Sequence, residues 1–145
     1  MMIGIAIGKY ERTSVENYDK FLQALDMNFL LRKVAAIASI KMEIQSRKLR
    51  NRESSRQWTI TTSSLTKSSE IRFKLDEKFD ETTIDGREYE SIMRVEDNTF
   101  VCLQKPKKKE QKSVLVVREF SSEGCTMTMG IVGKEIVCTQ HFKRI

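Results

Sequence analysis

The sequence has few of the residues on which metal and redox chemistry depends. Its 145 residues include one histidine, one proline and three cysteines, which lie far apart at Cys102, Cys125 and Cys138. This set matches no metal-ligand spacing, so we expect no metal site and no cofactor. The odd number of cysteines and the lack of a Cys-x-x-Cys pair predict free thiols, which are typical of a reducing cytoplasm.

Long hydrophobic runs are also missing. The run near the start, residues 1–7, is broken by Gly4 and is followed at once by Lys9, Glu11 and Arg12. It has neither a basic beginning nor a small-residue cleavage site, so we predict no signal peptide. No stretch approaches the roughly 18 apolar residues that a membrane-spanning helix requires.

Catalytic signatures are absent in the same way. The chain has no Gly-x-Ser-x-Gly motif, no phosphate-binding glycine loop and no dinucleotide fingerprint. Its carboxylates do not form pairs with apolar surroundings, so we interpret them as solvated and expect no enzymatic activity. The carboxylates considered are Glu16, Asp19, Glu77, Asp80 and Glu81.

Positive charge, by contrast, is present and concentrated. The formal net charge is +6, and each of two segments, 46–57 and 105–112, carries five basic residues against one acidic residue. These segments are either solvated turns or sites of attraction to anionic membranes, where each basic residue contributes on the order of 1 kcal/mol. Binding of nucleic acid is a further alternative. It lacks aromatic stacking platforms, because Trp58 only borders one segment and the other has no aromatic residue.

Hydrophobic periodicity predicts one strand, then a helical hairpin, then nine strands. Residues 5–12 alternate with period two, and apolar residues then recur at helical spacing over about 16–38, where Asn17 or Ser14 can cap the start. The remaining alternating stretches are residues 40–45, 57–63, 71–76, 79–84, 88–95, 99–104, 113–120, 124–129 and 135–142.

This order of elements predicts an all-β fold, a ten-stranded antiparallel up-and-down barrel in one domain over residues 1–145. Turn chemistry at Asp85-Gly86 and Asp97-Asn98 favours meander connections between consecutive strands. A sandwich would not need a helical hairpin after its first strand, whereas a closed barrel with one covered mouth accounts for it. Barrels of this size can enclose one small ligand.

Two polar residues stand out among the predicted strands. Gln140 shares a face with Cys138 and Phe142, which we expect to point inward, so its amide must be hydrogen-bonded either to the wall or to a ligand. Arg118 shares a face with Val116, but the opposite face of its strand is apolar as well. The pattern therefore does not decide where Arg118 points.

Several short motifs follow one another along the chain from residue 8. They are Gly8-Lys9-Tyr10, residues 17–22 (NYDKFL), residues 73–83 (FKLDEKFDETT), Asp85-Gly86-Arg87, Val117-Arg118-Glu119 and residues 137–143 (VCTQHFK). In order and spacing, apart from an insertion at 46–57, these motifs resemble those of the intracellular fatty-acid-binding proteins of the calycin superfamily. The resemblance implies a barrel with a helical lid around a water-containing cavity.

The resemblance also implies a function, the intracellular binding and transport of long-chain fatty acids or similar hydrophobic ligands. Arg118 is expected to point into the cavity and to hold the carboxylate with Gln140, because arginine stays protonated and matches a carboxylate with a planar fork. The implied ligand-binding residues, each of which can also be ordinary packing, are Arg118, Gln140, Phe142, Tyr18, Phe21 and Ile84.

Several positions depart from the family pattern. Arg12 stands where the family prefers an apolar residue, and Thr66 falls near the place of a frequent aromatic gate, which Leu65 can supply. Gln140 and Phe142 replace a frequent arginine and tyrosine. With one cation in place of two, the demand for a carboxylate is expected to be weaker, so a retinoid or another neutral lipid remains an alternative ligand.

The expected partners follow from the same resemblance. We expect a monomer in the cytoplasm, with transient contacts to anionic membranes through Lys20, Arg32 and Lys33 and through the two basic segments. No stable nucleic-acid partner is expected.

Overall fold

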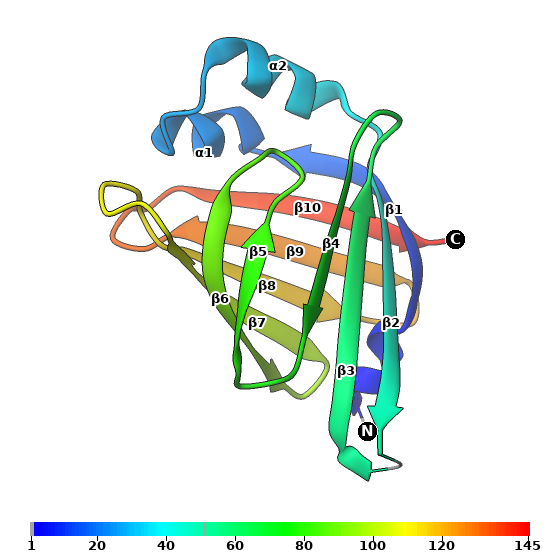
Figure 1. The fold of residues 1–145 in the computed structure, drawn as a ribbon. Helices are drawn as coiled ribbons and strands as arrows, with labels where there is room; N and C mark the ends of the chain where they lie inside the picture. Colours follow the sequence, from blue (N-terminus) through cyan, green and yellow to red (C-terminus); the bar gives the residue numbers. More distant parts are fainter. Residues whose placement is uncertain (1, 51) are drawn as a thin grey trace.

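The computed structural model describes residues 2–50 and 52–145, with the side chains of all of these except 52–54. It confirms the predicted fold class: ten antiparallel strands in one sheet curl into a nearly closed barrel, and two helices lie between the first and second strands (Figure 1). The elements are a 3-10 helix η1 (Met2–Ala6), β1 (Gly8–Glu16), α1 (Tyr18–Ala24), α2 (Phe29–Ile37), β2 (Lys41–Leu49), β3 (Arg52–Ser63), β4 (Ser68–Phe73), β5 (Lys78–Thr82), β6 (Glu88–Glu96), β7 (Thr99–Pro106), β8 (Val114–Phe120), β9 (Gly124–Ile131) and β10 (Val137–Arg144).

The barrel is sealed at one seam and open at another. The first and last strands, β1 and β10, pair with each other, whereas β4 and β5 form the two edges of the sheet. The Ser69 hydroxyl donates a hydrogen bond to the Thr82 carbonyl and so links these two edges through a side chain. The barrel is therefore closed by backbone pairing at the β1–β10 seam and is only nearly closed between β4 and β5.

The two ends of the barrel are closed differently. Figure 1 shows α1 and α2 across one mouth and η1 at the opposite end. Ile3 and Ala6 of η1 are buried, and the Tyr10 hydroxyl donates to the Ala6 carbonyl at 2.7 Å. Residues 5–7 were expected to begin the first strand, but residues 5 and 6 belong to η1, where Ala6 is buried and Ile5 is exposed, and β1 begins at Gly8.

The predicted basic turn 46–57 is mostly strand, which corrects that expectation. The β2–β3 register continues through Ser46↔Trp58 and Arg47↔Gln57 as far as Leu49↔Arg52. The hairpin consequently projects beyond the barrel wall (Figure 1). Its outer part has no core to face, so its side chains lack the apolar alternation by which a strand is recognised.

The two helices differ in how they meet the barrel. Tyr18, Phe21 and Leu22 of α1 are buried, whereas α2 has no buried residue. Asn17 precedes α1 in a left-handed conformation (φ 60°) without a side-chain cap, while the Asn28 side chain caps α2 by accepting from the Leu31 amide at 2.9 Å. Among the described residues, no helix combines the length and apolar character needed to cross a membrane.

Candidate ligand-binding cavity

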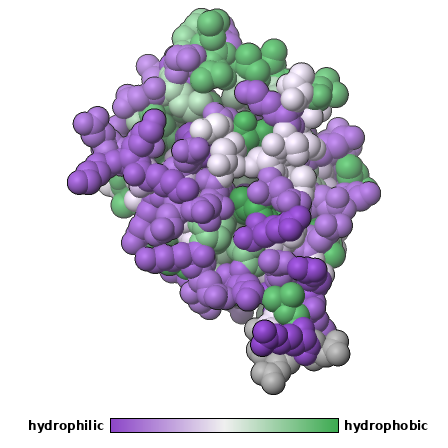
Figure 2. Space-filling view, viewed as in Figure 1, coloured by the Kyte–Doolittle hydropathy of each residue, from purple (hydrophilic) through white to green (hydrophobic). Residues whose placement is uncertain are grey.

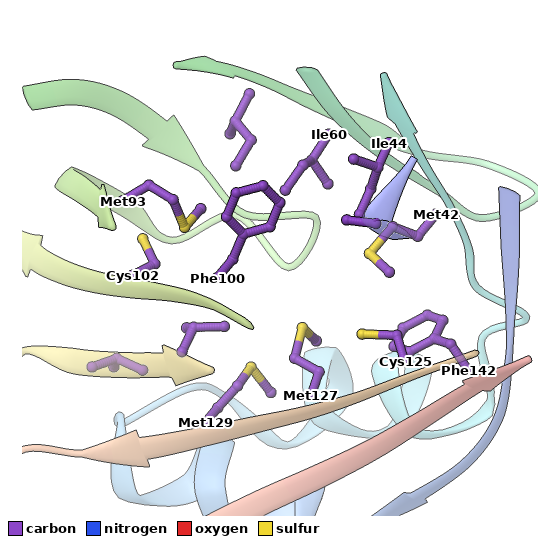
Figure 3. Packing of buried hydrophobic residues seen from close by; sticks show 14 of the residues in the cluster. Met42, Ile44, Ile60, Met93, Phe100, Cys102, Cys125, Met127, Met129 and Phe142 are labelled. Atoms are coloured by element: carbon purple, nitrogen blue, oxygen red, sulfur yellow. The ribbon is translucent and has the colours of Figure 1, made fainter. Parts of the chain in front are cut away.

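A cavity of about 450 Å³ lies inside the barrel beneath α2. This volume is within the range of small-molecule sites. Much of its wall is apolar, and Figure 3 shows Met42, Ile60, Met127 and Met129 pointing toward the barrel interior. Methionine side chains adapt to ligands of different shape, because they are unbranched and flexible. The apolar lining residues deep in the barrel are Ile40, Met42, Ile60, Ile71, Val116, Met127, Met129 and Phe142.

The mouth of the cavity lies between α2 and the turn after β3. Leu31 and Val34 of α2 line it on one side, and Leu65 and Thr66 line it on the other. The Leu65 side chain is 95% exposed, so it stands at the entrance and not in the core. Figure 2 shows hydrophobic side chains gathered at the end of the molecule that α2 covers.

The structure decides the orientation of Arg118. The residue is only 7% exposed and shares its face of β8 with the buried Val116 and Phe120. In the sheet it lies opposite Met127 of β9, which lies opposite Gln140 of β10. Arg118 and Gln140, which is 4% exposed, therefore stand in one inward-facing row that crosses three strands.

Two polar atoms in this wall lack partners. In the part of the chain that the structure describes, the buried Nε of Arg118 and the Oε1 of Gln104 have no hydrogen bond, and Arg118 forms no ion pair. A buried guanidinium without a counter-charge is costly, and water or a ligand must satisfy it.

Glu81 is buried, although the sequence analysis interprets it as solvated. It is 6% exposed, and it accepts hydrogen bonds from the Ser91 hydroxyl at 2.9 Å and the Cys102 thiol at 3.9 Å. Burial, together with the Glu81 charge, raises the pKa of Cys102 to about 12, so the thiol stays protonated and can donate. The burial of Glu81 could have been predicted from the alternation along β5, because Glu81 shares its face of the strand with Phe79.

A second carboxylate, Asp85, forms an ion pair with Arg87. Arg87 Nε lies 3.0 Å from its Oδ1, and the Arg87 Nη1 donates to the Tyr89 hydroxyl at 2.8 Å. Thr83 and Tyr18 donate their hydroxyls to the same carboxylate, the latter at 3.3 Å. Burial raises the pKa of Tyr18, and the Asp85 charge raises it further, so this hydroxyl remains a donor.

Arg12 also lines the cavity, which the sequence analysis noted only as a departure from the family. Its Nη1 donates to the Gln140 Oε1 at 3.3 Å, and its Nη2 donates to the Ala38 carbonyl at 2.7 Å. Its guanidinium stands 5.8 Å from the centre of the Tyr18 ring. The inward orientation of Arg12 could have been predicted from strand alternation, because Arg12 follows the fully buried Tyr10 by two residues.

The structure brings most of the predicted ligand-binding residues to one cavity. Five of the six line it: Tyr18, Ile84, Arg118, Gln140 and Phe142. Phe21 is not among the described residues that line it. That side chain is fully buried, and its ring lies 5.4 Å from the Arg87 guanidinium, so it supports the wall from behind.

Comparison with known proteins agrees with this geometry. Residues 7–143 match the model of the lipocalin / cytosolic fatty-acid binding protein family. The chain is 38% identical over 138 residues to a fatty acid-binding protein of Tyrophagus putrescentiae, across 94% of this chain and 95% of that protein. It is 33% identical over 138 residues to cellular retinoic acid-binding protein 1 of Gallus gallus, across 94% and 96%. A solved structure of a fatty acid-binding protein in brain tissue of Drosophila melanogaster superposes with a TM-score of 0.77 at 30% identity, covering 99% of each chain. The chain belongs to the lipocalin / cytosolic fatty-acid binding protein family.

Proposed function

We propose that this protein binds and carries one long-chain fatty acid, or a similar hydrophobic carboxylate, in the barrel cavity. The observation that carries the proposal is Arg118, a buried cation without an ion pair among the described residues, in a wall that is otherwise largely apolar. A carboxylate placed against Arg118 and Gln140 supplies the missing counter-charge. It forms hydrogen bonds about twice as strong as those between neutral groups.

The apolar wall accounts for the other half of the ligand. Burying an alkyl tail along Met42, Ile60 and Met129 contributes about 0.8 kcal/mol per methylene as an upper guide. Burial of the tail supplies most of the affinity, while the charged head group fixes the orientation of the ligand. The relatives from Tyrophagus putrescentiae and Gallus gallus are named for two hydrophobic carboxylates, fatty acid and retinoic acid.

A retinoid is the second candidate ligand. It is favoured by the 33% identity to a retinoic acid-binding protein over nearly the whole chain. The methionine-rich wall suits this alternative as well, because such side chains adjust to a rigid ring as readily as to a flexible tail.

The proposal is for a carrier in the cytoplasm, with no catalytic step. Three free, buried cysteines are consistent with a reducing compartment, and the matching family is described as cytosolic. Burial raises the pKa of Cys125 to about 12 and that of Cys138 to about 11, so neither thiol is activated as a nucleophile.

Loading and release are proposed to involve transient contact of the monomer with anionic membranes. Lys20 and Lys33 lie on the lid, where α2 also exposes Phe29 and Leu30. Arg32 forms an ion pair with Asp19 at 3.0 Å, which offsets its charge. The two lysines therefore contribute more to the attraction toward an anionic membrane. The basic β2–β3 hairpin and the 105–112 segment add long-range attraction.

The direct test is a calorimetric titration of delipidated protein with oleate. We expect saturable one-to-one binding at roughly micromolar Kd or tighter, about −8 kcal/mol or better, weakened in Arg118→Ala but not in the exposed control Arg94→Ala. Retinoic acid titrated in parallel ranks the two candidates. Absence of uptake of either ligand would overturn the proposal, and unchanged binding in Arg118→Ala would place the carboxylate elsewhere.

A further inference from the structure

Three arginines line the cavity, and they are not equivalent. Arg87 is neutralised by Asp85. Arg12, like Arg118, has no carboxylate partner among the residues that the structure describes, and its two hydrogen bonds go to the neutral oxygens of Gln140 and Ala38. Among the described residues, the cavity therefore holds two guanidiniums without an ion pair, one from β1 and one from β8, while the lining carboxylate Glu81 is hydrogen-bonded to Ser91 and forms no ion pair with either.

These two guanidiniums flank the same amide. Arg118 and Gln140 lie on either side of Met127, so their backbones are two strand spacings, about 10 Å, apart. Arg12 comes from β1, the other neighbour of β10, and its Nη1 reaches the Gln140 side chain at 3.3 Å. A small anion next to Gln140 is within reach of both arginines, given the length of an arginine side chain.

A β-bulge follows Arg12 directly in β1. The β1–β10 register shifts between Arg12, which lies opposite Phe142, and Ser14, which lies opposite His141. Bulges re-aim side chains and are frequent beside functional sites. Arg12 faces the interior of the barrel by the alternation that begins at Tyr10, and the shift after Arg12 turns Val15 inward as well.

We propose that Arg12 is a second head-group-binding residue, so that the ligand's carboxylate is held between Arg12 and Arg118, with Gln140 as the positioning residue between them. This inference rests on the proposed function and deepens it. In this arrangement β8 supplies one cation to the head group and β1 supplies the other.

The consequence is a stronger selection for a carboxylate than Arg118 and Gln140 alone would give. Two unpaired guanidiniums favour an anion and disfavour a neutral head group, because only the anion supplies the missing charge. Burial lowers the pKa of Arg12, which is the sign of a cation deprived of water, and a bound carboxylate would restore its stabilisation.

The alternative role for Arg12 is structural. Its bond to the Ala38 carbonyl, just after α2, ties the lid to the barrel. A tie of this kind would affect every ligand equally, whatever its head group, so the two roles are separated by comparing a charged ligand with a neutral one of the same tail.

The experiment measures the Kd of oleate and of oleyl alcohol for the wild type, Arg12→Met, Arg12→Gln and Arg94→Met. Arg12→Gln keeps a neutral donor near Gln140 and guards against loss of folding, and Arg94→Met removes an arginine from an exposed ion pair. We expect both Arg12 variants to weaken oleate about tenfold or more, with oleyl alcohol and the control changed less than about twofold.

Equal weakening of oleate and oleyl alcohol, or no change in either, would overturn the role of Arg12. Either result is distinguishable from failure of the proposed function, in which the wild type itself binds neither ligand.

Discussion

At the scale of single residues, the arginines of the cavity divide into a supporting set and a set available to a ligand. Asp85, Arg87, Tyr18 and Thr83 satisfy one another beneath the lid. Arg118 lacks any such partner among the described residues. The first set is expected to matter for stability, and the second for binding.

Replacing Arg87 by methionine tests the supporting set. Burial alone would raise the pKa of Asp85, but the Arg87 charge and hydrogen bonds from Arg87, Thr83 and Tyr18 outweigh it and hold that pKa below its usual value. Without Arg87 the buried carboxylate is unpaired, so we expect the free energy of unfolding at pH 7 to fall by about 3–5 kcal/mol. Urea unfolding provides the measurement, with Arg94→Met as an exposed control expected to cost less than about 1 kcal/mol.

The pH dependence of this loss has a definite sign. In the wild type, Asp85 stabilises the fold above its unfolded pKa of about 3.9, and that contribution is lost as the pH falls through the lower folded value. In Arg87→Met the folded pKa of Asp85 rises above the unfolded value, so its penalty is present at neutral pH and is relieved by protonation. The difference in the free energy of unfolding between the wild type and Arg87→Met should therefore become smaller as the pH falls toward 4. A difference that is constant from pH 7 to pH 4 would contradict the assignment.

Sequence reasoning reached only part of this residue-level picture. Parity on the last strand correctly predicted that Gln140 and Phe142 face inward. It could not decide Arg118, because both faces of β8 are apolar. Glu81 and Arg12 were missed because a hydrophobicity pattern treats a charged residue as outward-facing, whereas a ligand cavity is a place where a charge is kept inside.

At the scale of elements, α2 is the helix that is least buried against the barrel. No residue of α2 is buried, and Ile37 is 86% exposed. Every strand from β6 to β10, in contrast, is hydrogen-bonded on both sides and carries buried residues. The lid is therefore expected to open locally without unfolding of the barrel.

Hydrogen exchange tests this expectation. In the ligand-free protein, amides of α2 should exchange on the order of a hundredfold faster than those of β9 and β10, because local opening exposes little apolar surface. Added oleate should slow exchange in α2, since Leu31, Val34 and Ala35 line the cavity. Exchange in α2 as slow as in β10 before any ligand is added would show that the lid is not a separately opening element.

Element type was predictable where one face of an element is buried, and less so elsewhere. The helical hairpin and the ten strands follow from periodicity. The extension of β2 and β3 does not, because Arg47 and Lys48 pair with a partner strand beyond the core and leave no apolar alternation to detect. The predicted start of the first strand at residue 5 was wrong because an apolar run can also close a barrel end, as Ile3 and Ala6 of η1 do.

At the scale of the whole molecule, the packed core and the cavity lie at different ends of the barrel. The aromatic cluster of Trp58, Phe100 and Phe120 and the η1 helix fill one end, with ring centroids 5.0 Å and 5.9 Å apart within the cluster. The cavity occupies the other end under a lid that exposes apolar and basic side chains. This division permits a stable core and an open binding site in one small barrel.

The most direct test of the central claim is a crystal structure of the delipidated protein reconstituted with oleate. We expect one oleate per chain, with its tail against Ile60 and Met129 and its carboxylate in contact with Arg118 next to Gln140. A tail lying on the outer surface of α2, or a carboxylate at the mouth with its tail inward and Arg118 untouched, would contradict the account.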